Sequence, residues 1–358
     1  MLRYVIQRLV GAIPTLFLII VMCFFMMRIA PGGPFTQERA LPPEIEKNVL
    51  AAYDLDKPLL QQFIYVDSFV CQQRFAMWQT GQPPDAAALS GRGLQYVRGA
   101  FRETGGVQRE IKCLGGYFGK LLQGDFGPSF KKKDFSVSEL IADGAPVSAI
   151  LGISAILLAT AIGVTFGILA ALNQNRLQDY SLMTIAMIGI TIPSFVMAPI
   201  LTLIFGVYMG VLPVATWGGG AFNHLILPVT CLALPQIAVI SRLTRGGMIE
   251  IMRSNFVRTA RAKGLPERLV IGRHALRAAL LPLVSYLGPA TAALVTGSLV
   301  IEQIFQLPGI GKYFVTGAIE RDYTLVMGVI ILYAGLVIAL NLIADVVYGL
   351  LDPKVRFD

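Results

Sequence analysis

Charged residues are scarce in this chain of 358 residues. They make up 15% of it, whereas a soluble globular domain carries about 25%. Hydrophobic residues reach 55%, and the mean hydropathy is +0.65. This composition excludes an ordinary soluble domain and favours a protein that lies in a lipid bilayer.

Groups that carry catalysis or bind metals are scarce as well. The chain has two histidines and four cysteines, and no cluster of Cys, His, Asp and Glu has the spacing of metal ligands. A phosphate-binding loop of the form Gly-x-x-x-x-Gly-Lys-Ser/Thr does not occur, because Gly311-Lys312 is followed by Tyr313. We therefore expect a non-catalytic subunit that binds no ATP, metal or other cofactor itself.

Long charge-free apolar stretches are what the sequence has instead. A helix that crosses a bilayer needs roughly 20 mostly apolar residues. Six stretches meet this need: Leu9–Met27, Val147–Leu172, Leu182–Pro213, Phe222–Ser241, Ala278–Ile301 and Leu325–Ala344. We predict an all-α polytopic membrane protein with six transmembrane helices, the first of which is retained rather than cleaved as a signal peptide.

Basic residues near the helix ends predict the orientation, since Lys and Arg are enriched on the cytoplasmic side of a membrane. Arg3 and Arg8 precede the first predicted helix, and Lys354 and Arg356 follow the last. Both termini are therefore expected in the cytoplasm. The predicted order is a first helix (1–30), a soluble external domain (31–146), a five-helix core (147–352) and a cytoplasmic tail (353–358).

Two of the four cysteines, Cys71 and Cys113, fall in the predicted external segment. An oxidising compartment favours their pairing, so a Cys71–Cys113 disulfide is predicted. The alternative is two free thiols in separate helices. Cys23 and Cys231 lie within predicted spans, where a buried thiol acts as a small hydrophobe.

A basic stretch, Ser241 to Arg277, lies between the fourth and fifth predicted helices and carries nine Lys and Arg against two Glu. A helix is predicted from Met248 to Lys263, because apolar residues recur there at helical spacing. These residues are Ile249, Met252, Phe256 and Ala260. Gly264 is expected to end this helix in a left-handed conformation, and Pro266 to begin a second helix.

Two functions fit this helix–turn–helix, called the elbow below. It could lie as an amphipathic pair on anionic lipid, or it could dock onto a partner protein. Nucleic acid is not expected as a partner, because the flanking helices tie the segment to a bilayer surface. The residues alone leave the first two readings open.

Hydroxyl side chains in the predicted spans are candidates for lining a translocation path. They are Thr191, Ser194, Thr291, Thr296 and Ser298. Pro193 and Pro199 are expected to distort the third span, and distorted helices can flank cavities. Gly163 and Gly167, and likewise Gly206 and Gly210, have the spacing of close helix contacts. Charges near the spans lie toward helix ends, which argues against a proton-coupled carrier.

Several sequence blocks together carry a family resemblance. In the elbow, the order is Asn255-Phe256-Val257-Arg258-Thr259-Ala260-Arg261-Ala262-Lys263-Gly264-Leu265, then Arg273-His274-Ala275-Leu276-Arg277 and Leu280-Leu281-Pro282. The other blocks are Ala30-Pro31-Gly32, Gly124-Asp125-Phe126-Gly127, Ile192-Pro193-Ser194-Phe195, Leu307-Pro308-Gly309-Ile310-Gly311 and Asp352-Pro353-Lys354-Val355-Arg356. Taken together, the chain resembles the peptide branch of the ABC importer permeases, and most of all the B-type permease of oligopeptide importers.

The resemblance implies how the elbow works. In that family, a coupling helix inserts into a groove on a cytoplasmic ATPase, so Phe256, Arg258, Ala260 and Gly264 would be docking residues, next to Ile249 and Met252. The wider importer pattern has Glu-Ala-Ala where this chain has Arg258-Thr259-Ala260, a departure that is usual in the peptide branch. The segment 71–113 is longer than the family leads us to expect and is read as an insertion.

The resemblance also implies partners and a location. They are a homologous second permease, two cytoplasmic ATPases that hold ATP and Mg, an extracytoplasmic peptide-binding protein, a peptide substrate and membrane lipid. The expected location is the cytoplasmic (inner) membrane. Rival readings are an importer of nickel chelates, small antibiotics or sugars conjugated to peptides, a secondary transporter, and a membrane-anchored assembly protein.

Overall fold

The computed structural model describes residues 2–29, 58–63, 65–66, 114–122, 124–132, 135–296 and 299–351. Cys71, Cys113 and Ser298 lie outside these residues, as does most of segment 31–146. The predicted external domain, its insertion and its disulfide therefore stay predictions.

The described residues are mostly helical. In chain order the elements are α1 (Leu2–Ile29), α3 (Leu59–Phe63), β1 (Tyr65–Val66), β2 (Leu114–Gly115), α7 (Gly116–Leu122), α8 (Val137–Leu172), α9 (Leu177–Thr191), α10 (Ser194–Leu201), η1 (Thr202–Tyr208), η2 (Gly218–Gly220), α11 (Phe222–Met252), α12 (Asn255–Ala262), α13 (Glu267–Leu269), η3 (Val270–Ala275), α14 (Leu276–Ala279), α15 (Leu281–Val295), α16 (Leu299–Ile304), α17 (Ile310–Glu320) and α18 (Tyr323–Leu351). The strands β1 and β2 pair antiparallel.

Among the described residues, five helices are long and apolar enough to cross a membrane. The bent pair formed by α9 with α10 and η1 makes a sixth if it is counted as one span. This confirms the predicted class, a mainly helical polytopic membrane protein, with five or six spans among the described residues. Many large apolar side chains on these helices are exposed, such as Ile13, Leu157 and Ile185, and such side chains suit a helix that faces lipid.

The third span is broken where the sequence predicted a distortion. The helix axis turns by 102° between α9 and α10. Ile192, at the break, has an extended backbone (φ −94°, ψ 119°), because a residue that precedes proline is disfavoured in the α conformation. Pro193 thus ends α9, whereas Pro199 lies inside α10 without interrupting it.

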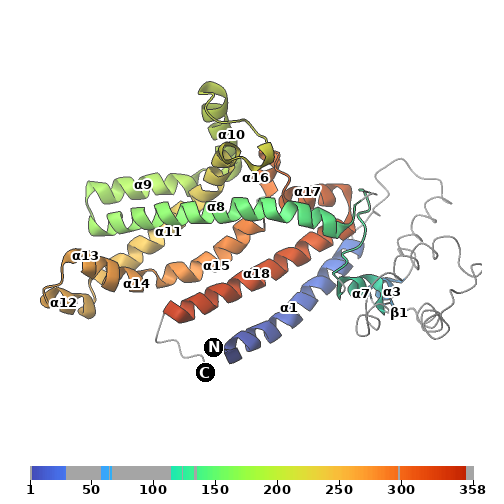
Figure 1. The fold of residues 1–358 in the computed structure, drawn as a ribbon, viewed down its shortest axis with the longest axis horizontal. Helices are drawn as coiled ribbons and strands as arrows, with labels where there is room; N and C mark the ends of the chain where they lie inside the picture. Colours follow the sequence, from blue (N-terminus) through green and yellow to red (C-terminus); the bar gives the residue numbers. More distant parts are fainter. Residues whose placement is uncertain are drawn as a thin grey trace, which may run out of the picture. The chain divides into compact units, whose positions relative to one another are not determined.

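The chain divides into two compact units, and unit 1 comprises 1–21, 140–319 and 329–358. In this unit, α8 and α9 both pack closely against α11. A Cβ at Gly167 of α8 would lie 2.5 Å from Cβ of Thr244, and one at Gly189 of α9 would lie 2.4 Å from the carbonyl oxygen of Leu234. Small residues let helix backbones approach in this way, so the contact predicted at Gly163 and Gly167 is confirmed. The contact predicted at Gly210 is not, because a Cβ there would meet nothing within 4 Å. Figure 1 shows α8 and α9 running side by side, with α12 and α13 at one end of this unit and α16 and α17 at the other.

Unit 2, which comprises 22–139 and 320–328, contains the end of α1 and the start of α18. Its described core includes a cluster of aromatic rings from Phe24, Phe63 and Tyr117. Asp322 precedes α18, is fully buried and accepts a hydrogen bond from the amide of Leu325, 3.2 Å away. The hydroxyl of Ser129 also donates to Asp322. This carboxylate therefore caps α18 and also holds the segment just before α8.

Candidate coupling site

The elbow differs from the single predicted helix over 248–263, because the helix breaks after Met252. α11 runs past the predicted end at Ser241 to Met252, and α12 begins at Asn255. At the break, Ser254 has an extended backbone (φ −69°, ψ 155°), and its hydroxyl donates to the carbonyl oxygen of Ile251 at 2.6 Å. Serine favours helix ends because its side chain competes for backbone groups. The prediction that the apolar stripe forms one continuous face of a single helix is therefore wrong.

Because of this break, Ala260 of the predicted stripe is buried but Phe256 is not, and Val257 is buried as well. Val257 is fully buried and Ala260 is 6% exposed, in one apolar cluster with Met248 of α11. The remaining buried members of this cluster are Val270, Ala275 and Ala279. Phe256, in contrast, is 47% exposed. An exposed phenylalanine on a short helix with a buried opposite face is suited to insertion into a partner.

The other predicted coupling residues divide between the two helices. Ile249 and Met252 are half-buried in the last turn of α11, whereas Arg258 is exposed on α12. The exposed cations of the elbow form one set, called the basic surface: Arg253, Arg258, Arg261, Lys263, Arg268, Arg273 and Arg277. The exposed ring of Phe256 therefore lies on an elbow that is rich in exposed positive charge.

Gly264 makes the turn of the elbow, as predicted. Its φ is +73°, a left-handed value that costs other residues about 1–2 kcal/mol, and its amide donates to the carbonyl oxygen of Arg261 at 2.9 Å. Across the turn, the guanidinium of Arg261 bonds the carboxylate of Glu267 at 2.6 Å. This hydrogen bond lowers the pKa of Glu267. Both side chains are well exposed, so the pair adds little to stability.

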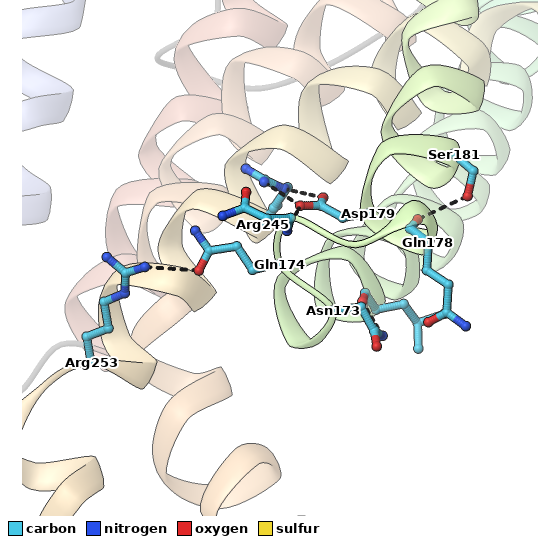
Figure 2. A network of polar contacts seen from close by, with 9 residues as sticks. Asn173, Gln174, Gln178, Asp179, Ser181, Arg245 and Arg253 are labelled. Atoms are coloured by element: carbon cyan, nitrogen blue, oxygen red, sulfur yellow. Dashed lines mark hydrogen bonds and ion pairs between the residues drawn. The ribbon is translucent and has the colours of Figure 1, made fainter.

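A buried ion pair joins α9 to α11 near the elbow (Figure 2). The guanidinium of Arg245 donates two hydrogen bonds, each 2.6 Å long, to the carboxylate of Asp179. Asp179 is 1% exposed and also accepts the amide of Asn175 at 2.9 Å. Arg253 reaches the side-chain oxygen of Gln174 at 3.0 Å. The turn between α8 and α9 therefore lies at the same end as the elbow, in agreement with the predicted topology.

Two adjacent glycines in α11 give a test of how tightly the elbow is packed. A Cβ at Gly246 would meet nothing within 4 Å, whereas a Cβ at Gly247 would lie 2.4 Å from the carbonyl oxygen of Ala279. Gly246→Ala is expected to raise the free energy of unfolding by about 0.5–1 kcal/mol, because alanine favours a helix. Gly247→Ala should lower it, since α14 must move away from α11. Thermal unfolding of the purified protein measures both; equal effects of the two changes would contradict this packing.

The predicted path residues do not form one group of free hydroxyls. Thr191, Thr291 and Thr296 each donate to the carbonyl oxygen four residues earlier in the chain, at 2.9, 2.6 and 2.9 Å. Thr296 is buried, Thr191 is exposed, and Ser194 is half-buried at the start of α10. A path lining built from these residues stays a prediction.

A buried carboxylate, Glu302, has a larger role than the sequence indicated. It is 1% exposed and accepts hydrogen bonds from the Ser148 hydroxyl and the Gly311 amide, both at 2.8 Å. A Cβ at Gly309 would lie 2.3 Å from a Glu302 carboxylate oxygen. The Leu307-Pro308-Gly309-Ile310-Gly311 block therefore wraps around an acidic side chain. The sequence signal for this site was an acidic residue, Glu302, followed shortly by two glycines two positions apart, Gly309 and Gly311.

Within the described residues, no three His, Cys, Asp or Glu side chains gather closely enough to hold a metal ion. What the structure presents is a bundle of membrane-spanning helices with one exposed, positively charged elbow, which is the build of a membrane-embedded transport subunit. The family described as "Binding-protein-dependent transport system inner membrane component" matches residues 163–357, and its N-terminal counterpart matches 1–87. The chain belongs to this family, the permeases of ABC importers, and is thus a multi-pass inner membrane protein.

Named relatives match along the whole chain. The oligopeptide transport system permease protein OppB of Salmonella typhimurium is 46% identical over 357 residues, which cover 100% of both chains. OppB of Haemophilus influenzae is 45% identical over 358 residues, again with 100% of both chains covered. The dipeptide transport system permease protein DppB of Bacillus subtilis is 36% identical, over 99% of this chain and 98% of its own. As a permease, the chain is a membrane subunit and not the ATPase of its system.

Proposed function

We propose that this chain is one permease subunit of an ATP-driven oligopeptide importer and forms half of the translocation path. The observation that carries the proposal is full-length similarity to permeases named for oligopeptide transport. The low charge of the predicted spans supports it, because a pathway wall with few fixed charges does not discriminate among the side chains of varied peptides.

The coupling mechanism follows from the elbow. A cytoplasmic ATPase that closes on ATP would hold Phe256 in a groove and carry α12 with it. Val257 and Ala260 fix α12 to the end of α11, and Gly167 and Gly189 place α8 and α9 directly against α11. Movement of the elbow would therefore pass to three spans as one rigid body.

The remaining partners and the orientation belong to the same proposal. A homologous second permease would supply the other half of the path, two ATPases with ATP and Mg would dock on the cytoplasmic side, and a peptide-binding protein would dock outside. Both termini would be cytoplasmic, and segment 31–146 would be external. The basic residues of the elbow support this orientation, since they are expected on the cytoplasmic side.

The experiment that tests the proposal is purification of the chain from its own membranes in a mild detergent, with identification of the chains that co-elute. A second permease and ATPase chains are expected. Uptake of a labelled oligopeptide into vesicles that contain the complex should require ATP and should be competed by unlabelled peptides of other sequences. Co-elution without an ATPase, or uptake driven by a proton gradient, would contradict the proposal.

The pairing of Cys71 with Cys113 remains our proposal for the external segment. The protein is expected to run faster on a gel without reductant than with it, because a disulfide keeps the denatured chain more compact. The Cys71→Ser and Cys113→Ser variants should each abolish this difference. A chain in which both thiols react with maleimide after denaturation without reductant would disprove the pairing.

A further inference from the structure

One side of α11 is left uncovered by the other described helices. Gly167 of α8 and Gly189 of α9 pack against two of its sides. Toward α15, the hydroxyl of Tyr286 donates a hydrogen bond to the side-chain oxygen of Gln236. Beyond the first turn of α11, the exposed residues are Arg242, Gly246 and Glu250. They recur every four residues, so they lie on one side of the helix.

The exposed residues of α11 and α15 differ from those of a helix that faces lipid. In α15 they are Pro282, Ser285, Pro289 and Ala293. These residues, together with Arg242, Gly246 and Glu250 of α11, are called the open face below. None of them is a large apolar residue, whereas α8 and α9 expose Ile153, Leu157 and Ile185. Lipid tails favour large apolar side chains and disfavour charged ones, so the open face is not suited to lipid.

Arg242 is the first charged residue after the charge-free stretch of α11. Its guanidinium donates to the sulfur of Met187 at 3.6 Å, and a thioether is a weak acceptor. No described carboxylate forms an ion pair with Arg242: Asp179 is bonded to Arg245, and Glu250 lies eight residues further along α11 (250 minus 242), about 12 Å away. Since a guanidinium has five N–H donors, Arg242 retains donors for an anion.

The side chain of Arg242 points away from the elbow. Its contact, Met187, is close in α9 to Gly189, which packs against Leu234. Leu234 precedes Arg242 by eight residues (242 minus 234), about 12 Å along the helix axis. In the proposed orientation, the guanidinium therefore points away from the cytoplasm and into the span. A cation near a lipid boundary extends the opposite way, toward the headgroups, so this arrangement suits an aqueous path instead.

We propose that the open face lines the translocation path and that Arg242 binds the carboxylate of the peptide there. This inference rests on the proposed function, which makes the chain a peptide permease with a cytoplasmic elbow. A guanidinium binds a carboxylate through two parallel hydrogen bonds. Because every peptide with a free C-terminus carries this group, one cation on the wall binds peptides of different sequence. The small and proline residues of α15 leave room for side chains of different size.

Thiol labelling tests whether the open face meets water. Arg242→Cys and Ser285→Cys are made one at a time, and the whole complex is treated in inverted membrane vesicles, with and without ATP, with a charged maleimide that does not cross membranes. Label beyond that of the unchanged protein is expected at both positions. The control is Ile185→Cys, 56% exposed on α9 and close to Met187 in the chain. It should not react, because a thiol in apolar surroundings does not ionise. Equal labelling of all three, or none at Arg242→Cys, would overturn the assignment of the wall.

Uptake tests the ligand of Arg242. The rate for a labelled oligopeptide is divided by the rate for the same peptide with a C-terminal amide. This ratio is expected to fall about tenfold in Arg242→Gln, the effect of one hydrogen bond to a charged group, and to fall less in Arg242→Lys. The preference of the binding protein cancels, because the same protein serves every variant. Arg176→Gln, which alters an exposed cation before α9, should leave the ratio unchanged.

The outcomes separate this inference from the proposed function. An unchanged ratio in Arg242→Gln would overturn the carboxylate site. Loss of the second permease from the purified Arg242→Gln complex would also overturn it, because the guanidinium would then bind an acid of that partner. If the wild-type complex takes up neither peptide, the oligopeptide assignment fails, and the labelling experiment still decides whether the open face lines an aqueous path.

Discussion

Phe256→Asp is expected to abolish the stimulation of ATP hydrolysis by the permease while the protein still inserts and folds. Phe256 is 47% exposed and is absent from the buried cluster of the elbow, so the change removes no core contact. It lies in the first turn of α12, where an acidic side chain is favourable. Loss of an aromatic anchor in an interface costs at least about 2 kcal/mol, roughly a 30-fold weaker docking equilibrium.

Two further variants make this result specific. Leu177→Asp alters a residue that is 83% exposed at the same end of unit 1 but outside the elbow, and coupling should remain near normal. Val257→Asp places a charge at a fully buried position and should disrupt the elbow itself. If Phe256→Asp couples as the wild type does, the ring of Phe256 does not dock, and an elbow that lies on lipid becomes the better account.

Arg245→Ala is expected to destabilise the protein by about 3–5 kcal/mol, because it leaves the carboxylate of Asp179 buried and unpaired. Asp179 is 1% exposed, and both of its hydrogen bonds from the guanidinium are 2.6 Å long. The midpoint of unfolding by heat or denaturant measures the loss. The rate of ATP hydrolysis should fall as well, since this pair holds α9 against α11 near the elbow.

The double variant Asp179→Leu/Arg245→Met tests whether the cost arises from the orphaned charge. Replacement of both partners by apolar side chains of similar size is often neutral, so the double variant should be more stable than Arg245→Ala. Arg242→Ala is the matched control: Arg242 is exposed in the same helix, and surface changes of this kind stay within about 0.5 kcal/mol. If the losses of stability in the single variants Asp179→Leu and Arg245→Met add up to the loss in the double variant, the two residues are not a coupled pair.

Local backbone chemistry made much of the elbow predictable. Gly264 and Pro266 have strong conformational preferences, and the structure places the turn and the start of α13 where these residues predict them. Ser254 was the signal that was missed. Its preference for a helix end is weaker than the apolar periodicity that runs through it, so the two helices were predicted as one and Val257 was not recognised as a core residue.

The charge-free stretches located the spans but underestimated the lengths of several helices. α11 continues for eleven residues beyond the predicted limit at Ser241, up to Met252, because a helix that leaves the bilayer becomes amphipathic without ending. Long-range contacts could not be predicted at all. The pairing of Asp179 with Arg245 and that of Glu302 with Ser148 join residues 66 and 154 positions apart, and no local pattern specifies such partners.

The late position of α11 in the chain has a consequence for biosynthesis. Gly163, Gly167 and Gly189 are translated before the residues of α11 that cover them. Until the ribosome has passed Met252, the glycine faces of α8 and α9 have no helix packed against them. Assembly of this bundle must therefore wait for α11, which is inserted after them. A nascent chain arrested ahead of Phe222 therefore holds two membrane helices that lack their common partner.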